Sequence, residues 1–322
     1  MPEVSVIIPT LGSHERLRRV LDGYDDQDAP AEEFEVIVVM DVAEPDSERV
    51  RAVAAGRSYG VSVLTGSLPG ASANRNAGIE AAKAPILLLT DNDTIPSPHL
   101  VAEHLRWHRR YPQPEVGVLG HVRWASEIEV TSFMHWLDQG IQFDFPSIQG
   151  VEAGWGRFYS SNCSLKRAFA DRVGGFDEEN LPYGYEDLDF GYRASKLGFR
   201  LLYNRRAEVE HLREMDLEFW RERVMRLAHA EHSFVEKHPE IPAYFLGKFS
   251  EVAHLPPARG RGRALIRWVP RNFPWLGERV WTSADLFYRQ ALAPRFLETW
   301  SVLESSGRPV TPYLNDPAHS GD

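Results

Sequence analysis

The sequence predicts an α/β fold with a mainly parallel central sheet flanked by helices, followed by a mostly helical C-terminal extension. In the first third of the chain, short apolar runs alternate with helical stretches, and from Asp216 onward the pattern becomes helical. The run Ile86-Leu87-Leu88-Leu89 is apolar without alternation, as expected of a parallel strand covered on both faces. Successive parallel strands are expected to be joined by right-handed crossovers.

The expected elements alternate along the chain. Strands are predicted at 4–8, 36–39, 61–64 and 86–89, and helices at 13–22, 47–55 and 72–82. Later in the chain, the pattern predicts a core strand at 116–122, an edge strand at 206–210 and a long amphipathic helix at 217–236. We divide the chain into a main domain, 1–214, and a helical extension, 215–322. The main domain has a first half, 1–100, and a second half, 101–214.

Acidic side chains are expected along one edge of this sheet. Asp41 closes the second strand, and Asp91 and Asp93 follow the fourth. The carboxyl ends of the strands are where open α/β sheets bind ligands, and oxygen ligands at that edge suit Mg²⁺ or Mn²⁺. Taken alone, Asp91-Asn92-Asp93 is a weak metal-site signal, and a turn that caps the next helix is the favoured interpretation without further motifs.

Further motifs favour a ligand site over a simple turn at Asp91-Asn92-Asp93. With Pro9-Thr10 ending the first strand, the acids resemble the nucleotide half of a family 2 glycosyltransferase of the GT-A fold. Gly70 and the segment 75–78 (Arg-Asn-Ala-Gly) match the family's Gly-x-x-x-Ala-Arg-Asn-x-Gly pattern, with Asn74 where Ala is usual. The blocks Asn-Cys-Ser (162–164), Gly-Gly-Phe-Asp (174–177) and Glu-Asp-Leu-Asp (186–189) follow in the family's order. The resemblance spans about residues 3–212.

The resemblance implies a metal-dependent, inverting glycosyltransferase of the hexosyltransferase type. Such an enzyme moves a sugar from a nucleoside-diphosphate donor to a hydroxyl acceptor, which is a glycan, a lipid-linked molecule or a small molecule. Two alternatives remain, a retaining GT-A enzyme and a catalytically silent nucleotide- or carbohydrate-binding module. A sugar-nucleotide pyrophosphorylase is disfavoured because the turn at 9–12 lacks a Gly-rich phosphate loop.

Asp187 is the expected catalytic base, because a sugar hydroxyl is a poor nucleophile until a positioned carboxylate accepts its proton. By resemblance, Glu186 hydrogen-bonds a hydroxyl of the acceptor or the donor. Asp189 and Arg193 are four residues apart on the helix expected here, so we predict that they form a structural ion pair.

The resemblance also implies a donor site with Mn²⁺ or Mg²⁺. Asp93 is the expected direct metal ligand, Asp91 contacts the ribose or reaches the metal through water, and His211 completes the coordination. The residues expected to contact the donor are Pro9, Thr10, Asp41, Arg75, Asp91 and Asn92. The second strand ends in Met-Asp-Val instead of the family's usual Asp-Asp-Gly-Ser, so UDP, GDP and dTDP carriers all stay open.

Acceptor contacts are expected at Trp155, which lies between two glycines, and at Asn162. The aromatic-rich stretch 133–145 could form an acceptor wall, but core packing is the favoured interpretation for most of its side chains.

Composition limits the partners and the location. The formal net charge of −10 over 322 residues argues against a nucleic-acid binder. A single cysteine and the absence of a basic leader predict a cytoplasmic protein. The Arg/Trp-rich segment 259–281 has two interpretations, a peripheral membrane contact or a surface helix with inward-facing aromatics, and Pro270 and Pro274 favour the second.

Overall fold

The computed structural model describes residues 1–306, so residues 307–322 of the expected extension lie outside the described chain. The described residues form two compact units. Unit 1 contains residues 1–127 and 148–213, and unit 2 contains residues 128–147 together with the described chain from 214 onward. The segment 128–147 groups with the C-terminal helices, whereas the sequence-based division assigns it to the 101–214 half.

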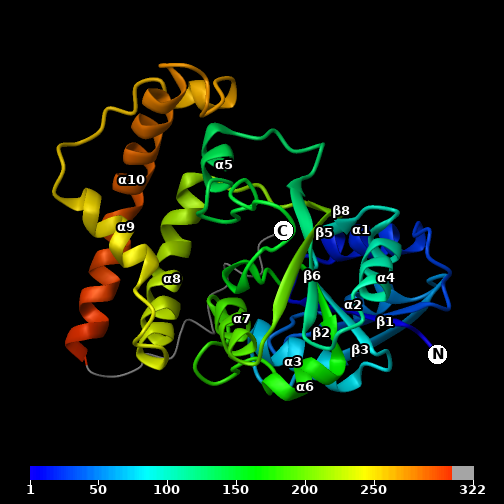
Figure 1. The fold of residues 1–322 in the computed structure, drawn as a ribbon. Helices are drawn as coiled ribbons and strands as arrows, with labels where there is room; N and C mark the ends of the chain where they lie inside the picture. The colour runs from blue at the N-terminus through cyan, green and yellow to red at the C-terminus, as the bar shows by residue number, and fades with distance from the viewer. Residues whose placement is uncertain (307–322) are drawn as a thin grey trace. The chain divides into compact units, whose positions relative to one another are not determined.

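Unit 1 is built on a central sheet that has eight strands within the described residues (Figure 1). Their order is β3-β2-β1-β4-β7-β6-β8-β5. The strands are β1 (Val4–Thr10), β2 (Phe34–Met40), β3 (Gly60–Thr65), β4 (Ile86–Thr90), β5 (Thr94–Pro96), β6 (Val116–Trp124), β7 (Asn162–Lys166) and β8 (Arg200–His211). All strands predicted from the sequence are present, and the strand expected at 206–210 is the end of the longer β8.

Helices connect and cover these strands. They are α1 (His14–Asp25), α2 (Ser47–Ala54), α3 (Ala71–Ala81), α4 (Leu100–Arg110), the 3-10 helix η1 (Trp155–Arg157), α6 (Arg167–Val173) and α7 (Glu186–Lys196). Helix α3 lies tightly against β1, because a Cβ added to Gly78 would come within 2.4 Å of Cγ2 of Ile7. Only glycine allows this close approach.

The sheet is mainly parallel, as the sequence predicts. Strand β1 pairs in parallel with β2 and β4, β2 with β3, and β6 with β8. Two strands run the other way: β7 is antiparallel to β4 and β6, and the short β5 is antiparallel to β8. The sequence pattern did not predict β5 or β7. The pairing of β5 with β8 nevertheless positions functional side chains described below.

Unit 2 is helical within the described residues. Its elements are α5 (Ser132–Leu137), α8 (Leu217–Lys237), α9 (Tyr244–Ala253), the 3-10 helix η2 (Arg263–Arg267) and α10 (Gly277–Ser306), which contains Pro294. Phe133 and Trp136 pack against Tyr288 with ring centroids 5.1 and 5.2 Å apart, and Nε1 of Trp136 donates a hydrogen bond to Asp285. Core packing of the 133–145 aromatics is therefore confirmed for the buried members, Phe133, Trp136 and Phe143.

One buried carboxylate of unit 2 stabilises the start of a helix. Glu231 is fully buried and accepts hydrogen bonds from the backbone amides of Phe245 and Leu246, so it caps the start of α9. No helix in the described part of the chain is long and apolar enough to cross a lipid bilayer.

Candidate active site

The turn after β4 is braced by hydroxyl groups. Thr94 Oγ1 donates to the carbonyl of Asp91 at 2.9 Å and accepts from the Asp91 amide at 3.2 Å. Nδ2 of Asn92 donates to Oγ1 of Thr10, which lies at the end of β1 beside Pro9. These bonds fix the Asp91-Asn92-Asp93 turn against the ends of the parallel strands, where the sequence predicts the donor site.

Strand pairing brings Asp93 close to His211. Thr94 and His211 are direct partners across the β5–β8 ladder, and the Leu212 amide donates to the Asp93 carbonyl at 2.7 Å. Asp93 Oδ1 lies 3.8 Å from His211 Nε2. The His211 ring is nearly perpendicular to the Trp124 indole, with ring centroids 5.4 Å apart. The predicted pair of metal ligands is thus adjacent, although its members are far apart in the sequence.

The spacing of this pair suits one divalent cation. Ligand distances of about 2.1 Å on each side span at most about 4.2 Å, so an ion can bridge two atoms 3.8 Å apart. Nowhere in residues 1–306 do three or more His, Cys, Asp or Glu side chains come together as a complete cage. A two-ligand site fits Mg²⁺ or Mn²⁺, because such ions use few protein ligands and complete their coordination with substrate phosphates and water.

His211 and Asp93 have a further partner in Arg213. Its guanidinium Nε lies 3.6 Å from Asp93 Oδ2, and its amide donates to Nδ1 of His211 at 3.3 Å. Coordination of a cation by Nε2 would place the proton of the neutral ring on Nδ1. Metal binding would therefore replace the hydrogen bond that Nδ1 accepts from the Arg213 amide. The Arg213 side chain is 24% exposed and adds positive charge at a place where a diphosphate is expected.

Asp41 stabilises the loops beside the predicted donor site. Its carboxylate is buried and accepts hydrogen bonds from the amides of Ala43 and Gly70 and from Nδ2 of Asn74. The bonds from Gly70 and Asn74 tie the end of β2 to the start of α3, and the bond from Ala43 closes the turn after β2. They also explain Asn74 in the place where the family usually has Ala, since its side chain serves Asp41.

Arg75 lies at the centre of the acidic groups. It is buried, and its nitrogens donate to Asp91 Oδ1 at 3.0 Å and to Glu186 Oε1 at 2.9 Å. Its Nη1 also lies 3.9 Å from Asp187 Oδ1, and its guanidinium lies 5.7 Å from the centre of the Phe176 ring. Burial raises the pKa of Asp91, and the charge of Arg75 opposes that effect. One cation therefore links the metal-side turn to the predicted catalytic acids.

The start of helix α7 presents these acids in an unusual conformation. Gly184 has φ of 78°, and Tyr185 has φ of 61°, which is rare for an aromatic residue. The consecutive left-handed residues turn the chain sharply so that Glu186 and Asp187 occupy the first helical turn. Backbone strain of this kind is concentrated at functional sites.

The carboxyl group of Asp187 has a raised pKa. Its Oδ2 accepts a hydrogen bond from the Ser160 amide at 2.9 Å, while the buried Oδ1 has no hydrogen-bond partner within the described chain. Burial raises the pKa of Asp187 to about 7, and the nearby charge of Arg75 only partly opposes the shift. The side chain as a whole is 26% exposed, so a substrate can reach it. A carboxylate of this basicity can accept a hydroxyl proton near neutral pH.

The remaining motif residues fix the position of the Gly-Gly-Phe-Asp segment (174–177). Asn76 bonds to the amide and carbonyl of Phe176, and a Cβ added to Gly175 would lie 2.7 Å from Asn76 Oδ1. Arg193 pairs with Asp189 at 2.8 Å and donates to the carbonyl of Gly175. The predicted ion pair between Asp189 and Arg193 is confirmed, and it positions the Gly-Gly-Phe-Asp segment.

One predicted acceptor residue is placed wrongly by the sequence interpretation. Asn162 is fully buried: Oδ1 is bonded to Nε2 of His104, and Nδ2 donates to the carbonyls of His121 and Ala207. All of these partners are core groups on α4, β6 and β8, so Asn162 cannot touch an acceptor. Trp155 is only partly buried, and its ring lies 5.1 Å from that of Tyr192. It stays the predicted acceptor contact.

Sequence analysis missed three residues of this site: Ser160, Arg213 and Trp124. Ser160 acts through its backbone amide, which carries no side-chain signal. Arg213 follows His211 by two positions and could have been noticed as a cation near a predicted ligand. Trp124 reaches His211 only through the register of β6 and β8.

Comparison with known sequences finds relatives over much of the chain. The family model described as glycosyltransferase like family 2 matches residues 2–230. Validoxylamine A glucosyltransferase from Streptomyces hygroscopicus subsp. limoneus is 27% identical over 283 residues, covering 75% of this chain and 58% of that protein. The uncharacterised glycosyltransferase YfnE of Bacillus subtilis (strain 168) is 26% identical over 247 residues, covering 62% of each protein. The chain thus spans about three fifths of the length of these relatives.

Comparison with solved structures finds similar folds. The mannosyltransferase PcManGT from Pyrobaculum calidifontis, in complex with GDP-Man and Mn²⁺, aligns with a TM-score of 0.56 and 18% identity over 96% of this chain and 76% of its own. Residues 1–349 of S. aureus TarS, in complex with UDP-GlcNAc, align with a TM-score of 0.54 and 16% identity, over 96% of this chain and 93% of that one. At such identities the likeness shows the shared fold.

Proposed function

Because the chain belongs to the glycosyltransferase family 2 and has the GT-A fold, we propose that it catalyses metal-dependent, inverting transfer of a hexose from a nucleoside diphosphate to a hydroxyl acceptor. The observation that carries this proposal is the state of Asp187. One oxygen of its carboxyl group has no hydrogen-bond partner in the described chain, and its pKa is raised to about 7. The carboxyl group also lies near Arg75, which binds Asp91 in the turn after β4.

In the proposed step, the acceptor oxygen bonds to the anomeric carbon while the bond from that carbon to the phosphate oxygen breaks. The hydroxyl proton passes to Asp187, and the nucleoside diphosphate leaves with the electron pair. The Ser160 amide orients Asp187, and Arg75 balances its charge. Glu186 is proposed to bind a sugar hydroxyl. Displacement from the face opposite the leaving group inverts the anomeric configuration.

We propose that Asp93 and His211 hold Mn²⁺ or Mg²⁺, with Asp91 reaching the ion through water or binding the ribose. A bound divalent cation would act as a Lewis acid that stabilises the charge developing on the leaving diphosphate. Arg213, close to Asp93, would add positive charge on the same side. The mannosyltransferase of similar fold was solved in complex with Mn²⁺, which supports this choice of ion.

The donor is proposed to be a hexose nucleotide with a UDP, GDP or dTDP carrier. The relatives support a hexose, since one is named a glucosyltransferase and one structural neighbour a mannosyltransferase. Pro9, Thr10 and Asn92 lie at the end of β1 and in the turn after β4, where they are proposed to contact the nucleotide. Asp41 would act indirectly, by holding the loop at Gly70.

The decisive experiment is single-turnover transfer by Asp187→Asn, after donors have been screened for metal-dependent thermal stabilisation. We expect donor binding to be kept and transfer to fall by at least about a hundredfold. Asp171→Asn, which alters an exposed carboxyl group on α6, is the matched control and should leave the rate unchanged. An unchanged rate in Asp187→Asn would refute the base assignment. NMR of the product anomer distinguishes inversion from retention.

A further inference from the structure

The segment 256–277 of unit 2 has a charge that contrasts with the rest of the protein. It contains five arginines and neither Asp nor Glu, whereas the chain as a whole has a formal net charge of −10. The segment includes η2 and lies next to the start of α10, shown in gold and orange (Figure 1). Such a local reversal of sign marks a surface that attracts anions.

Large apolar side chains are exposed in the same segment. Trp268 is 78% exposed and Trp275 is 79% exposed, and Phe273 and Leu265 are 48% and 44% exposed. The favoured sequence interpretation, in which the aromatics pack inward, holds for Trp281, which is buried and donates to the carbonyl of Val269. It is wrong for Trp268 and Trp275. Large apolar side chains gathered and exposed in one segment are typical of an interaction surface.

The backbone holds one of these rings outward. Trp275 has φ of 50°, a left-handed conformation that costs an aromatic residue free energy. The turn is closed by Gly277, where an added Cβ would lie 2.4 Å from the carbonyl oxygen of Pro270 and 2.5 Å from that of Arg271. Trp275 therefore lies in a compact, defined turn.

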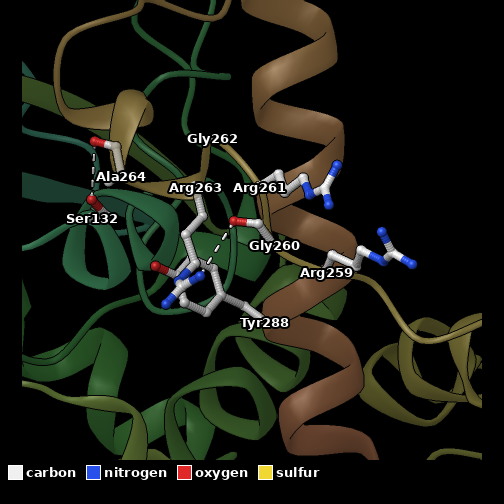
Figure 2. Close-up of a pocket in the computed structure, with 8 residues that line it drawn as sticks. All are labelled: Ser132, Arg259, Gly260, Arg261, Gly262, Arg263, Ala264 and Tyr288. Atoms are coloured by element: carbon white, nitrogen blue, oxygen red, sulfur yellow. Dashed lines mark hydrogen bonds between the residues drawn. The ribbon is translucent and has the colours of Figure 1, made fainter.

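The arginines differ in how they are engaged. Figure 2 shows Arg259 and Arg261 extending their guanidinium groups away from a pocket of about 380 Å³, while Arg263 folds back beside Tyr288. Arg263 lies 4.6 Å from the centre of the Phe287 ring, and Arg267 pairs with Glu129 at 3.1 Å. Arg259 and Arg261 are exposed, and neither pairs with a carboxylate in the described chain.

We propose that the segment 259–275 is a docking surface for an anionic lipid bilayer. Indole rings favour the boundary between headgroups and acyl chains, and arginines are attracted to anionic headgroups, each strengthening binding by about fivefold. The segment lies on the bilayer without spanning it, in agreement with the short η2 helix. This proposal is independent of the sugar-transfer reaction, because it uses no residue of the proposed active site.

Co-sedimentation of the full chain with vesicles tests the proposal. We expect binding to an equimolar mixture of phosphatidylcholine and phosphatidylglycerol, weakened by salt, and little binding to phosphatidylcholine alone. Arg259→Gln with Arg261→Gln should lower the partition coefficient by about tenfold or more, and Trp268→Ala with Trp275→Ala should lower it comparably. Both pairs are exposed, so their melting curves should match that of the parent protein.

Matched controls separate this site from general charge effects. Arg49→Gln with Arg51→Gln removes two exposed arginines with the same spacing from α2 and should leave binding unchanged. Leu197→Ala removes an exposed apolar side chain from unit 1 and should also have no effect. Failure to bind anionic vesicles, equal binding to neutral vesicles, or binding that survives both double substitutions overturns the proposal. Because no sugar nucleotide is present, none of these results bears on the proposed transfer reaction.

Discussion

Arg75 and Glu186 form a buried ion pair with 2.9 Å between Nη1 and Oε1. The pair joins helix α3 of the first half of the chain to helix α7 of the second. Since the same guanidinium also binds Asp91, the turn that carries the predicted metal ligand and the helix that carries the predicted base share one cation. A single side chain therefore contacts both parts of the proposed site.

Arg75→Gln should destabilise the protein by roughly 3–5 kcal/mol, because it leaves buried carboxylates without their cation. Urea unfolding followed by circular dichroism measures this free energy. The double variant Arg75→Gln with Glu186→Gln should recover part of the loss, since it removes the buried charge as well as its partner. A loss below about 1 kcal/mol in the single variant would mean that water replaces the guanidinium.

Transfer activity should rise with pH and reach a plateau above an apparent pKa near 7. Asp187 must be ionised to accept a proton, and its pKa is raised to about 7 by burial, with Arg75 and Glu186 as the charged groups facing it. The measurement is kcat/KM at saturating metal over a range of about pH 5 to pH 9. A profile that is flat between about pH 5 and pH 8 would contradict the assignment.

Asp187 should also make stability depend on pH. Between its ordinary pKa of 3.8 and the folded-state pKa of about 7, only the folded protein keeps the proton, so this group's contribution to stability falls as pH rises. Asp187→Asn removes that contribution. The melting temperature of the variant relative to the parent should therefore increase from about pH 4 to about pH 8, as measured by calorimetry. A constant difference between the two proteins would show that the pKa is not raised.

Removal of either predicted metal ligand should weaken the binding of Mn²⁺ together with a nucleoside diphosphate. For Asp93→Ala and His211→Ala we expect at least about a tenfold loss in calorimetric titrations, since each variant removes half of the protein ligands. His99→Ala is the control, because this imidazole is largely exposed and pairs only with Asp28 in the described structure. If His211→Ala binds Mn²⁺ and the nucleoside diphosphate as tightly as the parent protein, His211 is not a metal ligand and only carboxylates hold the ion.

Asn162→Ala should lower stability, because it leaves two buried backbone carbonyls and Nε2 of His104 without the partner that Asn162 supplies. The expected loss is roughly 2–4 kcal/mol in urea unfolding. Burial lowers the pKa of His104 to about 4, so the ring stays neutral and cannot compensate by ionising. The folded fraction should retain the parent KM for the acceptor, whereas Trp155→Ala should raise it. An acceptor-specific defect in Asn162→Ala would contradict the buried position.

The sequence predicts those features that depend on local pattern. The apolar runs ending at Thr10, Met40 and Thr90 identify β1, β2 and β4, and the spacing of Asp189 and Arg193 predicts their pair. The short strand β5 has only three residues, too few to show a period. Its pairing with β8, and therefore the distance between Asp93 and His211, depends on long-range register that no local pattern encodes.

Burial is the other property that the sequence left undecided. An Asn-x-Ser block is compatible with an exposed acceptor contact, and only its place on β7, in the middle of the sheet, shows that Asn162 serves the core. Trp268 and Trp281 belong to one Arg/Trp-rich segment, yet one is exposed and the other buried. Residue type alone cannot distinguish such cases, because the exposure of a ring depends on what packs against it.

The antiparallel pairing of β5 with β8 has a consequence for folding. The two strands come from distant parts of the chain, so their ladder closes a long loop, and we expect it to form late in the assembly of unit 1. We therefore expect Asp93 and His211 to come together only late in folding. Binding of a cation by Asp93 and His211 would therefore report when the β5–β8 ladder has formed. The rate of cation binding during refolding should equal the rate of the slowest refolding phase of the sheet.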